Sequence, residues 1–367
     1  AYAIRALCYL NLATWFSRAP YNSLTGASRW NEPCVPVYTT GTSIDTGGQP
    51  RESLRTVYGR IDQDIDRAIE LLEKARETTL AENNKSHINL YVALGIKSRA
   101  CLAEGDWDGA FKAAKRVIDE GGYAVGTKSD LTGGMNSLDK QNVMWGAGIQ
   151  VADQAGGYAG FFTHMDNKEG AYAKSAPKLI SKQLYNRISA TDIRRDWWDP
   201  SDKESPYVSK KFSFANVASF LGDYIYMRVE EMYFTAAEAA LRLDDLKSAR
   251  ELMNTVMAER DPGYSANNRS GTLLGATTTT WTGSFLENIL THRRIELWGE
   301  YGRLFDVRRL GQGIDRRTDD GFSEECISMM NRRNVNITKA DTYDWVLTIP
   351  KAELDANPNI NEEDQNP

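Results

Sequence analysis

Two segments of this chain, separated by 139 positions, share one pattern of small and large apolar residues. In the first segment the pattern is formed by Ala100, Leu102, Trp107, Ala110 and Val117, and in the second by Ala239, Leu241, Leu246, Ala249 and Val256. Small alanines let paired helices approach closely, and a large residue after a short turn fills the elbow of a helical hairpin. Because such hairpins bury their apolar faces only against one another, the repeat predicts a stack of tetratricopeptide-like helical hairpins.

Other stretches show the apolar spacing of three and four residues that is typical of amphipathic helices. The expected helices, including those of the two repeated hairpins, fall in residues 1–16, 51–75, 88–103, 108–119, 233–257 and 285–299. We expect the first two of these helices to form a third hairpin, with the loop of residues 20–50 inserted at its elbow.

The segment between the two repeats differs in composition. Glycines interrupt short apolar runs such as Val143–Trp145, which predicts loops, a few short strands and short helices, one of them at residues 178–188. The expected fold is therefore mainly α, a helical-hairpin scaffold with a loop-rich second lobe that contains a few short strands. The expected divisions are a first part of the scaffold (1–122), an inserted lobe (123–226), a second part of the scaffold (227–310) and a C-terminal extended, turn-rich segment (311–367).

The charge of the chain argues against a nucleic-acid partner. Its formal net charge is -6, so no global positive field attracts phosphate backbones. Basic and acidic residues alternate late in the sequence, at Arg293, Arg294, Glu296, Glu300, Arg303, Asp306, Arg308 and Arg309. We interpret this cluster as internal ion pairing. No stretch of about 18 apolar residues occurs, so no segment is expected to cross a membrane as a helix.

Metal and cofactor sites are not expected. The cysteines are Cys8, Cys34, Cys101 and Cys326. They lie far apart, and no CxxC motif or Cys/His cluster is present to bind zinc. Since Cys8 and Cys101 lie within apolar helical stretches, both are predicted to be buried thiols. The run Asp62–Asp66 resembles a calcium loop only superficially, because Arg67 stands where that loop requires glycine.

Signatures of catalysis are weak. His292 and Glu296 lie one helical turn apart, which suits an acid/base pair or half of a metal site, but a structural ion-pair helix is the preferred interpretation. No GxSxG elbow, P-loop or GxGxxG motif occurs between a strand and a helix. A glycoside hydrolase needs only two carboxylates a few ångströms apart, so that alternative stays open. We expect a protein that is not an enzyme.

Aromatic residues in the loops are a more informative signal. Trp30, Tyr38, Phe161, Tyr264 and Trp281 lie in stretches where burial is not assured. A flat ring stacks on the apolar C–H face of a sugar, while neighbouring Asn, Asp or Arg side chains bind the hydroxyls. The alternative is that these rings fix the loops to the scaffold. The first interpretation favours carbohydrate binding.

A series of motifs runs in order along the chain. They are the first helix with the later Val35-Pro36, the helix from Arg51 through Tyr58 to Ile65, the Gly105-Asp106-Trp107 elbow, Arg228 to Ala239, Ile289 to Arg309, and the ending with Ile349-Pro350, Asn357-Pro358 and Gln365-Asn366-Pro367. Together they resemble the SusD/RagB family, surface lipoproteins of Bacteroidetes that work in nutrient uptake. His292 stands where the family pattern has glutamate, a departure that concerns one ion pair.

The resemblance implies a function as well as a fold. It implies a cell-surface protein that binds an oligosaccharide or polysaccharide and delivers it to a SusC-like TonB-dependent transporter of the outer membrane. It also implies an outward-facing lipoprotein whose only membrane contact is an N-terminal lipid anchor outside this chain. No cofactor and no catalytic group are required, because the transporter supplies the energy. A peptide- or protein-binding helical scaffold with no sugar site is the alternative.

The resemblance also indicates where a ligand would bind. Relatives place stacking aromatics and a hydrogen-bonding asparagine in the loop before Val35-Pro36 and in the loop before the helix that contains Ile289. The predicted ligand-binding residues are Trp30, Asn31 and Trp281, with Arg29, Tyr38 and Tyr264 as further candidates.

Overall fold

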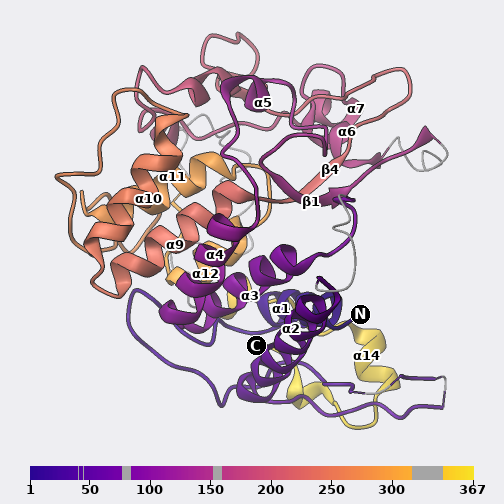
Figure 1. The fold of residues 1–367 in the computed structure, drawn as a ribbon. Helices are drawn as coiled ribbons and strands as arrows, with labels where there is room; N and C mark the ends of the chain where they lie inside the picture. Colours follow the sequence, from indigo (N-terminus) through magenta and orange to yellow (C-terminus); the bar gives the residue numbers. More distant parts are fainter. Residues whose placement is uncertain (40, 44, 77–83, 152–158, 316–341) are drawn as a thin grey trace.

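A computed structural model describes residues 1–367 apart from 40, 44, 77–83, 152–158 and 316–341. The scaffold is a series of helices in which α1, α2, α3, α4, α9 and α10 each pack on the next, and α11 packs on α9 (Figure 1). These helices are α1 (Tyr2–Phe16), α2 (Leu54–Arg76), α3 (Leu90–Glu104), α4 (Trp107–Glu120), α9 (Val229–Arg242), α10 (Leu246–Ala258) and α11 (Phe285–Glu296). The predicted hairpins are confirmed, including the pairing of α1 with α2 across the long loop.

The two repeated hairpins turn in the same way. In the α3–α4 elbow, Gly105 has φ +76°, and the Asp106 side chain caps α4 by accepting a hydrogen bond from the amide of Gly109, the third residue of the helix. In the α9–α10 elbow, Asp244 has φ 62°, and Asp245 caps α10 in the same manner. Left-handed backbone followed by an Asp cap stops one helix and starts the next within a few residues. The repeat therefore extends to the turn itself.

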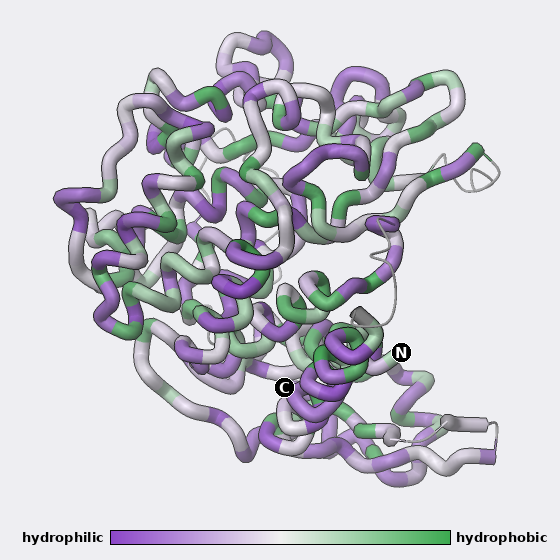
Figure 2. The backbone as a smooth tube through the Cα atoms, in the orientation of Figure 1, coloured by the Kyte–Doolittle hydropathy of each residue, from purple (hydrophilic) through white to green (hydrophobic). Residues whose placement is uncertain are grey.

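Alanine makes the close packing possible. Ala236, Ala237, Ala239 and Ala240 of α9 are fully buried between α4, α10 and α11. Helices with such small contact residues approach closely, and their apolar side chains then form one continuous core. Along the scaffold helices, hydrophobic and hydrophilic residues alternate around the tube, as expected for helices with one buried face (Figure 2).

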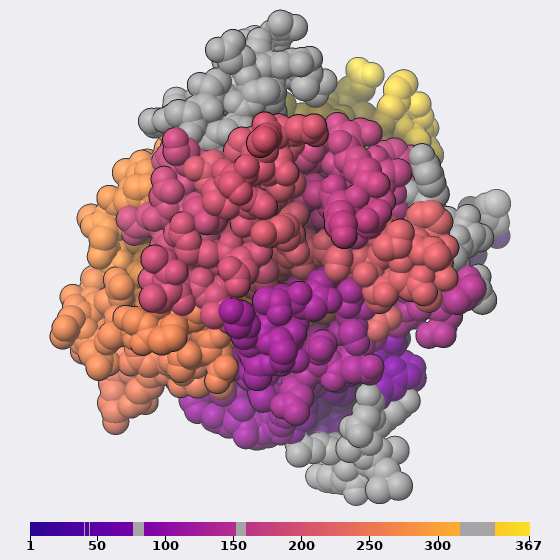
Figure 3. Space-filling view, turned by 90° about the horizontal axis from the view of Figure 1, so that it is seen from above, coloured from indigo at the N-terminus to yellow at the C-terminus, as the bar shows by residue number. Residues whose placement is uncertain are grey.

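The segment between α4 and α9 forms a second apolar core around Phe162, Trp197, Trp198 and Phe212. Its elements are α5 (Lys128–Thr132), β1 (Val143–Ala147), α6 (Phe161–Met165), α7 (Ala171–Ser175), α8 (Lys182–Tyr185), the 3₁₀ helix η2 (Ile193–Trp197), β2 (Trp198–Asp199), β3 (Val208–Ser209) and β4 (Tyr224–Arg228). Strands β1 and β4 pair antiparallel, as do β2 and β3. Seen from above, residues of this segment spread over one face of the molecule (Figure 3).

The helix predicted at residues 178–188 is shorter than expected. Only Lys182–Tyr185 is helical, because Leu179 pairs with Val208 in an isolated β-bridge and Ser181 then caps α8. Pairing with a neighbouring strand overrides the local helical preference.

The remaining elements close the fold. They are α12 (Arg303–Leu310), η4 (Tyr343–Trp345), α14 (Lys351–Ala356) and η5 (Glu362–Asp364). The tail returns to the first hairpin: the Asn366 side chain donates to the Phe16 carbonyl at 2.9 Å, and Arg51 donates to the Asp364 carbonyl at 2.6 Å. The ending motif therefore ties the C-terminal tail to α1 and to the loop before α2.

Three other predictions can be compared with this structure. Cys8 is exposed, contrary to the prediction, because α1 turns Ala6, Tyr9 and Leu10 inward and Cys8 outward; Cys101 is buried, as predicted. Cys326 lies outside the described residues. Residues 62–66 are helical rather than a calcium loop, as expected. Among the described residues, no helix is both long and apolar enough to cross a membrane.

Candidate ligand-binding site

A buried network of charges joins α9 and α11 to the second core. Its cations are Arg194, Lys211, Arg228 and Arg260, and its anions are Asp192, Glu230, Glu296 and Glu300. All eight side chains are 8% exposed or less, and the four positive charges match the four negative ones. Buried charges persist only when they are paired and hydrogen-bonded, so this balance stabilises the arrangement of the surrounding elements.

Glu296 lies at the centre of the network. Its Oε1 accepts from Arg228 and Arg260 at 3.0 Å each, and its Oε2 accepts from Arg260 at 3.0 Å and from Arg194 at 3.2 Å. Burial alone would raise the pKa of this carboxyl, but the three guanidinium groups hold the pKa well below its usual value. Glu296 is therefore a permanent anion with a structural role.

His292 has the same structural character. Burial, together with the positive charge of Arg194, lowers the pKa of His292 well below its usual value. Its Nδ1 lies 2.9 Å from Nη2 of Arg194, a geometry that requires a neutral imidazole accepting the bond. His292 and Glu296 thus form the ion-pair helix expected from the sequence, without an acid/base pair open to a substrate.

A cavity of about 490 Å³ lies beside this network. Its walls come from α1, α3, β1, α6, β4 and the loop after α11, and consist of Leu7, Asn11, Arg99, Met135, Trp145, Phe161, Phe212, Tyr224, Ile225, Tyr226, Gly299, Glu300 and Tyr301. Both the helical scaffold and the loop-rich segment contribute, and six of these residues are aromatic. This size and lining are typical of small-molecule sites, which are mainly apolar with a few fixed polar groups.

The aromatic rings of the cavity hold one another in place. Trp145 and Tyr226 meet edge to face with ring centroids 5.0 Å apart, and Phe161 meets Phe212 in the same way at 5.3 Å. Tyr226 remains 41% exposed. Such contacts leave ring faces available while fixing their orientation.

The polar groups of the cavity are equally constrained. Arg99 pairs with Glu231, donates to the Tyr226 carbonyl at 2.9 Å, and lies 3.9 Å over the ring of Tyr301. The hydroxyl of Tyr301 in turn donates to Asn11 at 3.4 Å. The site therefore offers rigid aromatic surfaces next to preorganised donors and acceptors.

Glu300 is the carboxylate of this wall. Its two oxygens accept from Lys211 at 2.5 Å and from Arg228 at 2.8 Å, and these cations hold its pKa below the usual value although burial would raise it. Burial lowers the pKa of Lys211 to about 8. Because Glu300 stays ionised and fully engaged, it has no proton to give to a leaving group.

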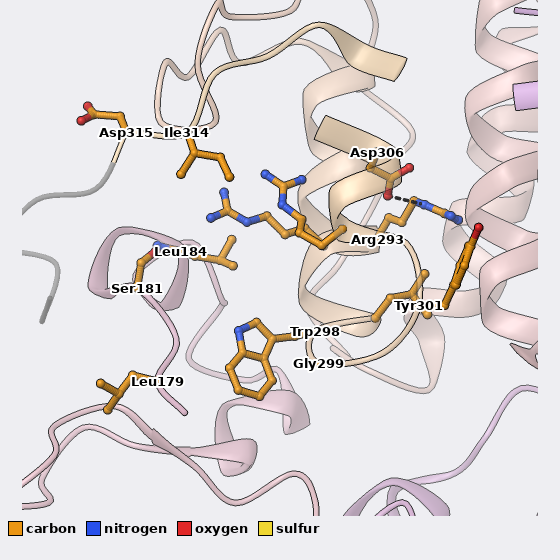
Figure 4. Close-up of a pocket in the computed structure, with 13 residues that line it drawn as sticks. Leu179, Ser181, Leu184, Arg293, Trp298, Gly299, Tyr301, Asp306, Ile314 and Asp315 are labelled. Atoms are coloured by element: carbon orange, nitrogen blue, oxygen red, sulfur yellow. Dashed lines mark hydrogen bonds and ion pairs between the residues drawn. The ribbon is translucent and has the colours of Figure 1, made fainter. Parts of the chain in front are cut away.

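A second pocket of about 170 Å³ shares the wall residues Gly299 and Tyr301 with the aromatic cavity (Figure 4). Leu184 of α8, its cap Ser181 and the preceding Leu179 contribute to one part of its wall, and Trp298, which follows α11, contributes to another (Figure 4). Arg293 in its wall is paired with Asp306 at 2.9 Å, which confirms the predicted internal ion pairing. The smaller pocket holds less space for a sugar chain than the aromatic cavity.

The residues predicted from the first long loop lie near the start of α2. Trp30 is half-buried against the core, edge to face with Tyr58 at 5.7 Å, and Arg55 lies 5.8 Å from its ring. Arg29 lies 3.8 Å from Glu32, and Asn31 is exposed. Trp30 thus fixes the loop to the scaffold while Asn31 stays open to solvent.

The other predicted residues lie elsewhere. The Tyr38 hydroxyl accepts from the Gln49 amide at 3.2 Å. Tyr264 donates to Asn288 at 2.8 Å and packs against His292, and burial raises its pKa to about 12. Trp281 lies under Arg187 at 4.5 Å, near the first turns of α11.

The structure therefore brings Tyr264 and Trp281 to the start of α11, whereas Trp30 and Tyr38 stay beside the first hairpin. None of the six lines the aromatic cavity. Phe161 is the one loop aromatic named above that does. The other cavity rings were missed, although Tyr224 and Tyr226, two positions apart in a strand, point to the same side and offered a signal.

Comparisons with known proteins agree with this architecture. The SusD family model matches residues 165–367. A SusD-like carbohydrate binding protein from Bacteroides vulgatus ATCC 8482 is 26% identical, with a TM-score of 0.77 over 99% of this chain and 76% of that one. A SusD superfamily protein from Bacteroides thetaiotaomicron VPI-5482 is 24% identical, with a TM-score of 0.76 over 100% of this chain and 76% of that one.

A surface glycan-binding protein A from Bacteroides uniformis has the same fold at 18% identity, with a TM-score of 0.63 over 100% of this chain and 76% of that one. No curated protein matches the sequence. Since the family match extends over more than half of the chain and the mainly helical fold is shared, the chain belongs to the SusD family.

Proposed function

We propose that this protein binds an oligosaccharide at the cell surface, in the aromatic cavity, and delivers it to a SusC-like TonB-dependent transporter. The observation that carries the proposal is the convergence of six aromatic side chains with Asn11 and Arg99 around one 490 Å³ space. Sugars present apolar C–H faces and hydroxyl edges, so they need ring surfaces and fixed polar groups together. The names of two similar structures, a carbohydrate binding protein and a surface glycan-binding protein, support the same ligand class.

The chemistry of the cavity favours binding without hydrolysis. A glycoside hydrolase requires two carboxyl groups, one of which holds a proton for the leaving group. Within the described residues that line the cavity, Glu300 is the one carboxylate, and its two cations keep it ionised. The ligand would therefore leave the site intact, as a delivery protein requires.

The binding site can be tested by comparing two double variants by calorimetry against a panel of oligosaccharides. Trp145→Ala with Tyr226→Ala removes two rings from the cavity, and we expect affinity to fall at least about tenfold, or about 1.4 kcal/mol. Trp30→Ala with Trp281→Ala removes the rings predicted from the sequence and serves as the matched control. If only the Trp30→Ala, Trp281→Ala variant lost affinity, the ligand would bind at the loops and not in the cavity.

A different result would rule out glycan binding as the function. If no glycan of the panel binds to the unaltered protein while a peptide or protein partner is captured, a peptide- or protein-binding scaffold replaces the proposal. Release of reducing ends from a polysaccharide would instead show a hydrolase.

Delivery and location have their own test. We infer an outward-facing lipoprotein of the outer membrane, as in the family pattern. Purification of the full-length protein from outer membranes should recover a TonB-dependent barrel with it. Recovery from the cytoplasmic fraction without such a barrel would contradict this part of the proposal.

A further inference from the structure

Three carboxylates meet where α2 crosses the elbow between α3 and α4. Glu104 ends α3, Asp106 caps α4, and Asp62 of α2 lies within hydrogen-bonding reach of Glu104. Within the described part of the chain, none of the three forms an ion pair with a lysine or arginine. Lys97 is the cation that faces them, and its ammonium group is paired with Asp66. The cluster therefore carries negative charge without a paired cation.

A thiol points into the same cluster. Cys101 is only 2% exposed, and its thiol has no hydrogen-bond partner among the described residues. Its Sγ and one carboxylate oxygen each from Glu104 and Asp106 all lie within 4.8 Å of one another. The helical scaffold thus directs a buried sulfur without a hydrogen-bond partner toward two carboxylates. A thiol that only filled space in the apolar core would not need to face these groups.

Glycine keeps the adjoining space open. A Cβ at Gly109 would lie 2.1 Å from Asp106 Oδ2 and 2.8 Å from Cys101 Sγ. Any other residue would therefore push the two ligand-bearing groups apart. Gly109 lies in the first turn of α4, and its amide donates to the Asp106 cap at 3.0 Å.

The electrostatics of the cluster call for a positive species. Burial and the neighbouring charges of Asp62 and Asp106 raise the pKa of Glu104 to about 8. Burial and the neighbouring charges of Glu104 and Asp106 also raise the pKa of Cys101. Repulsion among such groups is relieved either by retaining protons or by binding a cation.

We propose that Cys101, Glu104 and Asp106 bind a divalent cation that accepts both sulfur and oxygen, of the Zn²⁺ class, with Asp62 orienting Glu104. Zinc takes Cys sulfur at about 2.3 Å and carboxylate oxygen at about 2.0–2.2 Å in a tetrahedral arrangement, so a modest contraction of the three groups completes three of its four positions. Ca²⁺ prefers oxygen ligands alone and would leave the thiol unused. The bound ion would fasten the first repeated hairpin to α2. This site is independent of the glycan site.

The test uses Co²⁺ as a spectroscopic probe and Zn²⁺ as its competitor. Co²⁺ bound by a thiolate gives a near-ultraviolet charge-transfer band, and we expect this band in the unaltered protein and its loss on adding Zn²⁺. Cys101→Ser should abolish the band, whereas Cys34→Ser, which removes another buried thiol, and Cys8→Ser, which removes the exposed one, should leave it in place.

A second variant separates ligand loss from misfolding. Glu104→Gln removes a carboxylate that, without metal, is repelled by Asp62 and Asp106. The fold should therefore be kept, while Zn²⁺ affinity falls at least about tenfold. Absence of the band in the unaltered protein, a band that survives Cys101→Ser, or Zn²⁺ affinity unchanged by Glu104→Gln would each overturn the site.

Discussion

Replacement of Glu296 by glutamine tests whether the charge network holds the two cores together. The carboxylate accepts four hydrogen bonds from Arg194, Arg228 and Arg260, and its side chain is fully buried. Glutamine keeps the shape, but its amide group turns hydrogen-bond donors toward guanidinium donors. The network then holds four cations and three anions in a medium from which water is excluded.

The expected cost follows from that imbalance. Removing one partner of a buried ion pair destabilises a protein by about 3–5 kcal/mol, since the remaining charge is left uncompensated. Equilibrium unfolding in urea at pH 7 measures this free energy. Glu70→Gln is the matched control, because Glu70 pairs with Arg67 and Lys74 on the surface, where solvent screens the charges and the substitution should change stability little. A loss below about 1 kcal/mol for Glu296→Gln would refute the structural role of the network.

Acid should reproduce part of this effect. The pKa of Glu296 is lower in the folded protein than its ordinary value of 4.5, so the folded state binds fewer protons there than the unfolded state. This contribution to stability is complete above pH 4.5 and is lost as the pH falls through the folded pKa. The Glu296→Gln variant should therefore lose less stability than the unaltered protein on acidification below pH 4.5, and parallel curves would contradict this assignment.

Three further predictions concern the scaffold. Without metal, Glu104→Gln should be more stable than the unaltered protein at pH 9 by roughly 1–2 kcal/mol. The reason is that the pKa of Glu104, raised to about 8 in the folded protein, makes the unaltered protein lose stability as the pH rises from 4.5 to 8. Equal stability of the two proteins in urea titrations at pH 9 would contradict this. Ala240→Leu should cost about 1–3 kcal/mol by overpacking the α9 interface, whereas Ala258→Leu at the exposed end of α10 should be nearly neutral by thermal melting, and equal effects would refute the close approach. Asp245→Ala should cost about 1 kcal/mol by removing the cap on the Ser248 amide, and an unchanged urea midpoint would show that the cap is dispensable.

Local signals explain why the scaffold was predictable. Helical periodicity and alanine spacing depend on residues close in sequence, and they correctly placed both repeated hairpins. The turns also carry local chemistry, since Asp106 and Asp245 occupy the same position of the repeat. The short helix at α8 was overestimated because a distant residue, Val208, pairs with Leu179.

The aromatic cavity was not predictable in the same way. Its residues extend from Leu7 to Tyr301 and meet only after the scaffold closes on the loop-rich segment. Trp145 and Tyr226 lie in short strands, where apolar side chains usually signal a core, so the spacing of Tyr224 and Tyr226 showed a shared side of the strand but not that this side lines a cavity. The proposed metal ligands show the same limit, because Asp62 and Glu104 become neighbours only when α2 packs on α3.

The loop residues Trp30, Asn31 and Trp281 stay a prediction. The resemblance to the family indicated them by position, whereas the structure gives Trp30 and Trp281 partners on the scaffold. Both rings are partly exposed, so each retains a surface for a ligand. The two double variants described above decide between these loops and the cavity.

A crystal structure of the protein with its tightest-binding oligosaccharide is the most direct test of the central claim. We expect a sugar ring within about 4 Å of Trp145 or Tyr226, with hydroxyls bound near Asn11 and Arg99. Density for the sugar over the long loops, with the cavity free of it, would contradict the proposed site.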